Sequence, residues 1–235
     1  MITYVDSQSA STFDELHVVP KPSGVVEGDL LLATTQVLPA DNGIVYPNEV
    51  TQVPVGWTQV AHTDWEEDTA SHRRFWIRLF KKVAGASEPA DYTFGLADPD
   101  TDGREVTMAA YRGCDPTTPI EAVSSSVTNA EDLPTTTLII PSVTTLDANR
   151  LLVIEFFRAI SFGVATFDPP TWVQHTGHGV LCTIHDKQQV SAGASGDQTA
   201  THISMTRGAF LVALVPADAI PGYRFDCSTI DSQIN

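Results

Sequence analysis

The pattern of apolar positions predicts a chain built from short β-strands. Residues 30–33 form an uninterrupted apolar run that follows the turn residues Gly28 and Asp29. A short apolar run beside turn signals is typical of a strand that is buried on both faces. The surrounding stretch, residues 20–36, begins with Pro20 and Pro22, which remove backbone donors and exclude a helix there. We therefore expect the core to be arranged around this strand.

A second pattern is strict alternation, which is clearest in residues 73–83. Successive side chains of a strand point to opposite faces, so every second residue shares a face. Ile77 and Leu79 share one face here, and Trp76 and Phe80 share the other. Alternation over this length predicts a strand, and the two aromatic residues indicate that its second face is also partly covered.

Further strands are expected where short apolar segments stand between clusters of Gly, Pro and Asp, and no segment has the periodicity of an amphipathic helix. The polar residues 6–12 are expected to form a connection. This pattern predicts an all-β protein, a β-sandwich of jelly-roll or immunoglobulin-like type with about seven strands in each half. The expected strands are residues 2–5, 16–19, 30–38, 56–60, 73–83, 92–96 and 106–112, and then 123–127, 138–140, 151–157 and 209–215.

The same motifs occur twice along the chain. Val19-Pro20 recurs as Ile140-Pro141, and Leu31 recurs as Leu152, at one spacing because 140 − 19 and 152 − 31 both equal 121. Later motifs recur at smaller spacings: Trp57 and Trp172 differ by 115, the segments 84–87 and 192–195 by 108, and the last strands by about 103. Shrinking spacings indicate shorter loops in the second copy.

The repeat predicts two internally duplicated halves, residues 1–116 and 117–217, followed by a C-terminal tail, 218–235. The alternative is one continuous two-sheet jelly roll without internal symmetry. The tail is polar but contains three apolar side chains, each worth about 1.5–3 kcal/mol if a neighbour covers it. We expect these side chains, Tyr223, Phe225 and Ile230, to act as assembly anchors.

Charge excludes several kinds of partner. The chain has 29 acidic and 13 basic residues, a net charge of −16. Nucleic acid and anionic lipid both attract basic patches, so neither is an expected partner. No apolar run approaches the ~18 residues of a membrane helix, and no signal peptide is visible. With synthesis in a reducing cytoplasm, the thiols of Cys114, Cys182 and Cys227 are expected to be reduced.

One segment resembles a metal-binding loop. Asp98, Asp100 and Asp102 precede Gly103 with the spacing of a calcium loop, in which alternate carboxylates converge on one cation. The twelfth position, where such loops carry Glu, is Ala109. The sequence therefore predicts no cofactor and favours an acidic loop between two strands, with a calcium site as the alternative.

A group of histidines and a cysteine offers a weaker metal hypothesis. His175, His178, Cys182 and His185 are close in sequence. A strand through Cys182 and His185 would direct their side chains to opposite faces, because they are three residues apart. A buried cysteine with two loop histidines explains the same residues.

The sequence contains no hydrolase elbow, phosphate-binding loop or zinc-protease motif, so we expect no enzyme. Glu27, Asp29 and Glu155 could be a carboxylate pair for glycoside cleavage, but the first two lie in a turn that an acidic residue would serve. Trp57 and Trp172 occupy equivalent positions, which favours a core role. Trp65, in the acidic segment 62–72, is the candidate binding aromatic.

Several motifs together resemble a group of bacteriophage virion proteins found in head and tail regions. The first half contains KPSGVVEGDLLLA, PVGWTQV, FKKVAGASEPADYTF and AAYRGCDPTTPIEA, and the second contains LIIPSVTTLDANRLLV, PPTWVQ, SAGASGD and AFLVALVPA. Their fixed order carries the resemblance, which spans residues 16–217. Proteins of this group are structural and bring no catalytic residues to transfer.

The resemblance implies a non-enzymatic virion component, such as a capsid decoration or cement protein. Its expected partners are other virion proteins, namely major capsid or tail proteins, and further copies of itself. Its expected location is the virion, assembled in the host cytoplasm. The alternative is a tail or tail-fibre module that binds a receptor or glycan, with Trp65 at the site. A hydrolase acting on a host surface polymer is the third hypothesis.

Overall fold

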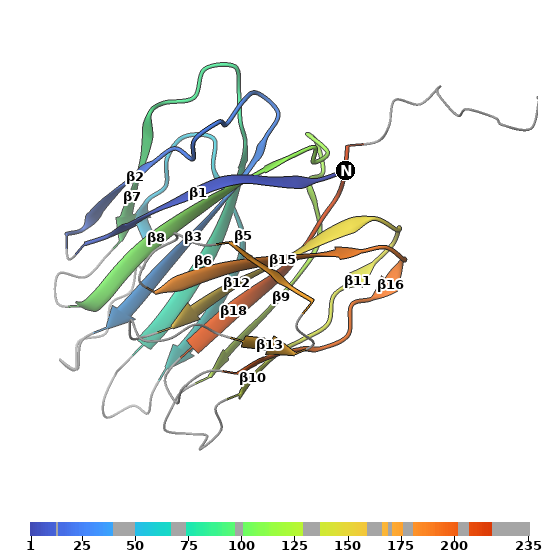
Figure 1. Ribbon diagram of the computed structural model, residues 1–235. Helices are drawn as coiled ribbons and strands as arrows, with labels where there is room; N and C mark the ends of the chain where they lie inside the picture. Colours follow the sequence, from blue (N-terminus) through green and yellow to red (C-terminus); the bar gives the residue numbers. More distant parts are fainter. Residues whose placement is uncertain are drawn as a thin grey trace, which may run out of the picture.

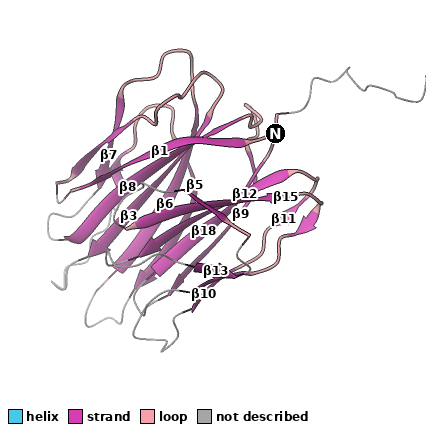
Figure 2. Cartoon of the chain, viewed as in Figure 1, coloured by secondary structure: helices cyan, strands magenta, loops and turns pink. Residues whose placement is uncertain are grey.

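A computed structural model describes residues 1–12, 14–39, 50–66, 74–96, 101–128, 137–158, 166–168, 171–175, 181–201 and 207–217. These ranges form β-strands and turns (Figures 1 and 2). They contain no helix with the length and apolarity needed to cross a membrane. The predicted all-β class is therefore confirmed, and the strands are arranged in several antiparallel sheets.

The first half of the chain contributes one sheet of five strands and one of three. The five-stranded sheet has the order β1-β8-β3-β6-β5, and the smaller sheet has the order β2-β7-β4. All neighbours are antiparallel. The strands are β1 (Thr3–Ser11), β2 (Leu16–Pro20), β3 (Leu30–Pro39), β4 (Val50–Gln52), β5 (Thr58–Glu66), β6 (Arg74–Val83), β7 (Asp91–Leu96) and β8 (Thr101–Arg112).

The second half contributes sheets of the same two sizes. The larger has the order β9-β18-β12-β15-β14, and the smaller has the order β10-β17-β13. A short pair, β11 (Thr144–Thr145) with β16 (Gly193–Ala194), accompanies them. The other strands are β9 (Ile120–Thr128), β10 (Thr137–Ile140), β12 (Arg150–Arg158), β13 (Thr166–Asp168), β14 (Val173–His175), β15 (Cys182–Gln189), β17 (Gln198–Thr201) and β18 (Arg207–Leu214).

Strand order and register correspond between the halves. Leu31 pairs with Lys82 and Ala110, and Leu152 pairs with Lys187 and Ala213. The first strand of each larger sheet also has a register shift at the same place, between residues 4 and 6 in β1 and between 120 and 122 in β9. Paired positions of one large sheet therefore have register-equivalent positions in the other wherever both sheets contain the strand pair.

The turn before the core strand is also the same in both halves. Gly28 and Asn149, which are 121 residues apart in sequence, both have a positive φ, 87° and 61°. Glycine and asparagine are the residues that adopt this left-handed conformation most readily. A left-handed residue thus precedes β3 and β12 at equivalent places.

This turn gives a prediction with an internal comparison. No atom lies within 4 Å of a Cβ placed on Gly28, so Gly28→Ala should cost only the backbone strain, about 1–2 kcal/mol. Asn149→Gly should leave stability unchanged or raise it slightly, whereas Asn149→Ala should lower it. Urea denaturation of the three variants tests this, and an Asn149→Ala protein as stable as the parent would contradict it.

Three hydrophobic clusters organise the strands into four layers. The two five-stranded sheets face each other across a central cluster, and each packs its other face against its own three-stranded sheet (Figure 1). The halves therefore share a core. The central cluster includes Leu30, Leu32, Ile77, Leu79 and Tyr111 from the first half and Leu151, Val153, Phe157, Ile184, Phe210 and Val212 from the second.

The structure confirms both apolar patterns. The side chains of residues 30–33 are completely buried, and β6 buries Ile77 in the central cluster and Trp76 in the outer one. The predicted connection at residues 6–12 was wrong in part, because β1 continues to Ser11. β1 is an edge strand, and its side chains are partly exposed except for the buried Ser7. Polar residues can therefore remain in contact with water there.

Candidate functional site

The contact between the two five-stranded sheets, here called the seam, has a polar centre. Thr34 on β3 donates a hydrogen bond to the Glu155 carboxyl on β12. These residues are 121 apart, so register-equivalent positions of the two halves meet each other here. Glu155 is buried, and loss of hydration raises its pKa to about 7. The hydrogen bond from Thr34 acts in the opposite direction and lowers the pKa, but its effect is smaller.

A second buried carboxylate lies nearby on β8. Glu105 accepts a 3.0 Å hydrogen bond from Thr107 and another of 3.0 Å from the backbone amide of Leu181. Thr107 pairs in register with Thr34, so the two carboxylates approach the same part of the seam. Both carboxylates are about 1% exposed, so they are closed to a substrate. Each accepts a hydrogen bond from the opposite half of the chain, and their role is to join the two sheets.

One edge of the seam carries an accessible polar cluster. The rings of Tyr4 on β1 and His175 on β14 stack with their centroids 3.7 Å apart. His175 Nε2 lies 2.7 Å from Asp186 Oδ2, and the Tyr4 hydroxyl lies 2.5 Å from the Ser7 hydroxyl. A cavity of about 390 Å³ opens beside them, and Tyr4, His175 and Asp186 line it. Both halves of the chain contribute to this site, which we call the seam pocket.

Tyr111 is buried behind the seam pocket, and its hydroxyl has no hydrogen-bond partner within the described ranges. Its ring meets that of Tyr4 edge to face, with centroids 5.8 Å apart. Burial, together with the negative charges of Asp186 and Glu155, raises the Tyr111 pKa well above its ordinary value. The phenol therefore stays neutral, and its hydroxyl is a buried polar group whose hydrogen-bonding capacity is not used among the described residues.

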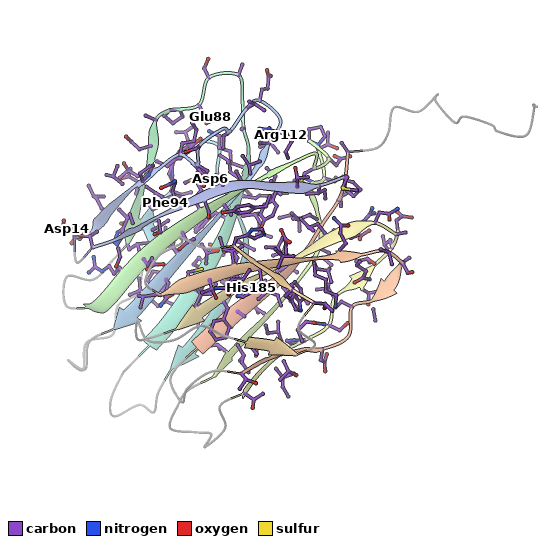
Figure 3. The ribbon with its side chains drawn as sticks, in the orientation of Figure 1. Asp6, Asp14, Glu88, Phe94, Arg112 and His185 are labelled. Atoms are coloured by element: carbon purple, nitrogen blue, oxygen red, sulfur yellow. The ribbon has the colours of Figure 1, made fainter. Side chains whose placement is uncertain are left out.

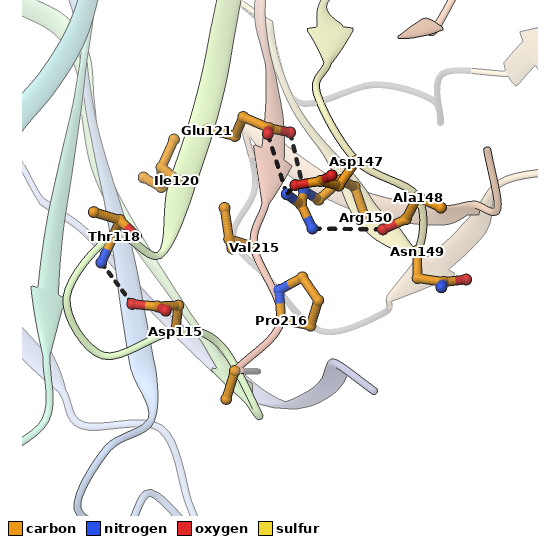
Figure 4. Close-up of a pocket in the computed structure, with 11 residues that line it drawn as sticks. Asp115, Thr118, Ile120, Glu121, Asp147, Ala148, Asn149, Arg150, Val215 and Pro216 are labelled. Carbon is orange, nitrogen blue, oxygen red and sulfur yellow. Dashed lines mark hydrogen bonds and ion pairs between the residues drawn. The ribbon is translucent and has the colours of Figure 1, made fainter. Parts of the chain in front are cut away.

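A second, larger cavity of about 700 Å³ lies where the chain passes through Val215 and Pro216 (Figure 4). Its polar wall is an ion-pair network in which Arg150 Nε donates to Glu121 at 2.9 Å and Arg150 Nη2 donates to Asp147 at 3.0 Å. The charged groups of this network bind one another, which indicates a structural role.

The first half has an ion pair at the corresponding place. Asp29 is 121 residues before Arg150, and its two carboxylate oxygens accept from Arg112 at 3.0 and 2.9 Å (Figure 3 labels Arg112). Asp29 also accepts from the backbone amide of Val26 at 2.9 Å. This confirms the expectation that Asp29 serves the turn. Because Glu155 lies in the seam, it cannot form a catalytic pair with Asp29.

Comparison of the chain with protein-family models, with curated protein sequences and with solved structures found no match. No relative therefore contributes to the assignment of these sites. Their assignment rests on the geometry of the described residues.

The two register-equivalent tryptophans lie mainly in the cores. Trp57 is 8% exposed and packs edge to face on Tyr92 and Phe94. Trp172 is half-buried and donates from Nε1 to Gln198 at 3.2 Å. Lys82 lies over Tyr92, and its register equivalent Lys187 lies over Trp172, so a cation–π contact is repeated as well.

The predicted calcium loop is not supported at its last two positions. Asp102 and Gly103 belong to β8, where Gly103 pairs with Leu38 of β3, so the sharp turn that the motif needs at this glycine is missing. Asp98 and Asp100 lie outside the described residues. Within the described ranges, no three His, Cys, Asp or Glu side chains gather as a metal site requires.

The histidine hypothesis fails on geometry. Cys182 belongs to the central cluster, whereas His185 lies on the opposite face of β15, beside Thr183 (Figure 3 labels His185). Burial and the neighbouring His175 lower the His185 pKa to about 4. His178 lies outside the described residues. Cys114 and Cys182 form no disulfide among the described residues, and burial raises the Cys114 pKa to about 12.

Two predicted sites stay predictions. Trp65 lies in β5 opposite Phe75, but its side chain is outside what the structure describes. The tail residues Tyr223, Phe225 and Ile230, with Cys227, also lie outside it. No local sequence pattern indicates the seam pocket, because its residues are far apart in the chain. Comparison of the two halves position by position could have found it.

Proposed function

We propose that the chain is a non-enzymatic structural protein of a bacteriophage particle, and specifically a decoration or cement protein of the capsid. The ordered motifs that resemble virion proteins support this proposal. In the same proposal, its partners are major capsid proteins and further copies of itself, and its place is the assembled virion.

The observation that carries the proposal is an exposed apolar side chain at an equivalent outward position of each outer sheet. Val18 on β2 is 53% exposed and Ile139 on β10 is 59% exposed, and they are 121 residues apart. Val18 pairs with Thr93, and Ile139 pairs with Thr199, so the two surroundings correspond. The solvent face of an antiparallel sheet is ordinarily polar. Apolar residues at equivalent outward positions favour contact with neighbouring subunits on two sides.

We also propose that each half is a jelly roll and that the halves arose by duplication. When the short pair β11 and β16 is left out of the count, the first strand of each half pairs with the eighth, the second with the seventh and the third with the sixth. Thus β1-β8, β2-β7 and β3-β6 correspond to β9-β18, β10-β17 and β12-β15. A long hairpin rolled on itself produces this order. The shared register shift and the left-handed residues at 28 and 149 support a common origin.

The test is incorporation into particles. The double variant Val18→Glu, Ile139→Glu should fold normally, because both side chains are exposed, and should be lost from purified particles by tenfold or more. Val55→Glu is the matched control, since Val55 is 94% exposed in a turn. A cryo-EM map with and without the protein would locate it. Normal incorporation of the double variant, or a particle that never contains the protein, would refute the proposal.

A second candidate function is a tail or tail-fibre module that binds a receptor or glycan. The seam pocket favours it, because a cavity with exposed polar atoms is not needed for packing. A map that places the protein on the tail would support this candidate over capsid decoration.

A further inference from the structure

The two halves provide an internal control for the seam, because its two edges are built from register-equivalent strands. β1 contacts β14 at one edge, and β9 contacts β5 at the other. A residue needed only for packing should be replaced by a similar residue at the other edge. A polar residue at one edge whose counterpart at the other edge is apolar is therefore not explained by packing alone.

The register identifies each counterpart. Tyr4 pairs with Tyr111, which pairs with Leu30, and Ile120 pairs with Leu214, which pairs with Leu151. Leu30 and Leu151 are equivalent core positions, so Ile120 occupies the place of Tyr4. By the same reasoning Val123 replaces Ser7, Ala61 replaces His175 and Lys81 replaces Asp186.

The edge of β9 packs in the ordinary way. Ile120, Val123 and Ala61 are partly buried apolar residues packed against the central cluster. At the edge of β1 the same three places carry a phenol, a hydroxyl and an imidazole, and the fourth carries a carboxylate beside the imidazole. Packing between the sheets is thus possible with apolar residues, and the polar set is an addition at one edge.

Two atoms of this set are left for a ligand. Asp186 uses Oδ2 to accept from His175, and Oδ1 has no hydrogen-bond partner among the described residues. A carboxylate can only accept, so His175 Nε2 carries the proton, and its Nδ1 has no partner in the same part of the chain. Ile2, Leu151 and Val173 provide apolar walls beside these polar atoms.

The composition of the walls selects the ligand class. Lys187 also lines the pocket, but its ammonium lies over the Trp172 ring. The Asp186 carboxylate disfavours an anion such as phosphate, and two side chains are too few for a divalent cation. The about 390 Å³ cavity lies within the size range of small-molecule sites. A pyranose ring has hydroxyls that both donate and accept and a C–H face that suits apolar walls. We propose that the seam pocket binds a single pyranose unit of a glycan, a site that does not depend on whether the protein sits on head or tail.

The experiment is saturation-transfer NMR and calorimetry of the full chain with methyl pyranosides of glucose, galactose, mannose and N-acetylglucosamine. At least one should bind with a Kd of about 1 mM, the affinity expected of a ligand of this size. Asp186→Asn and Val173→Trp should each weaken binding tenfold or more. Val173 is 57% exposed, so its replacement narrows the cavity without disturbing the core.

Lys81→Asn is the matched control at the other edge and should bind as the parent does. Melting temperatures within a few degrees of the parent show that each variant is folded. No transfer to any of the four sugars at tens of millimolar would overturn the proposal. Undiminished binding by the folded Val173→Trp protein would also overturn it, because the ligand would then sit elsewhere.

Discussion

Replacement of Glu155 by Gln should stabilise the protein above pH 7 by about 3 kcal/mol and leave its stability near pH 4.5 almost unchanged. Burial raises the pKa of Glu155 from 4.5 to about 7. Between these pH values the unfolded chain releases the proton and the folded chain retains it, so stability falls as pH rises and is constant above the folded pKa. The difference between the two pKa values corresponds to about 3 kcal/mol.

Gln removes the titration but keeps an oxygen that can accept from Thr34. The measurement is urea denaturation of both proteins at several pH values between 4.5 and 8.5, with the difference in unfolding free energy plotted against pH. Asp115→Asn is the control, because hydrogen bonds from Thr117 and Thr118 lower the Asp115 pKa to about 2, below the measured range. Its substitution should lower stability by the same amount at every pH between 4.5 and 8.5. A difference between Glu155→Gln and the parent that does not change with pH would contradict the prediction.

A cavity made in either outer core should destabilise the whole chain. Phe156 packs between the second-half sheets and Phe94 between the first-half sheets, and both side chains are fully buried. Phe→Ala changes in cores typically cost about 3–5 kcal/mol. Because the halves share the central cluster, neither can unfold without exposing an apolar face of the other.

We therefore expect Phe156→Ala and Phe94→Ala each to lower one cooperative melting transition. Hydrogen exchange read by mass spectrometry should show loss of protection in both β3 and β12 for each variant. Independent halves would instead give two transitions, of which only the mutated half moves. Calorimetry distinguishes the two outcomes, since a single cooperative unit has equal calorimetric and van't Hoff enthalpies.

Much of the fold can be predicted from local pattern, and the rest depends on distant contacts. Residues 30–33 indicate a doubly buried strand by themselves, and the repeat at 121 residues locates its equivalent. The alternation of apolar residues and the residue types of turns involve only neighbouring positions, so both can be recognised in a single sequence. The part of β1 that follows residue 5 could not be predicted, because its residues are polar on both faces. It is a strand because it pairs with β8, and local pattern does not indicate that pairing.

The arrangement of the seam could not be inferred in the same way. Nothing near Thr34 or Glu155 in sequence indicates that the two side chains meet, and the buried carboxylate becomes tolerable only through that meeting. The same holds for Tyr4 and His175, which come from opposite halves. Polar residues inside core strands were the available signal, and each required a partner that local pattern does not identify.

The contact of Thr34 with Glu155 has a consequence for how such a chain could evolve. In the proposed duplication, two separate identical subunits would have placed the same residue against itself at this point, as a twofold interface does for residues on its axis. If that residue was glutamate, two carboxyl groups faced each other, and one had to hold a proton. Once the subunits are joined in one polypeptide, each copy can mutate alone. Linkage thus permits a threonine to meet a glutamate, and it permits one edge of the seam to become a polar pocket while the other remains apolar.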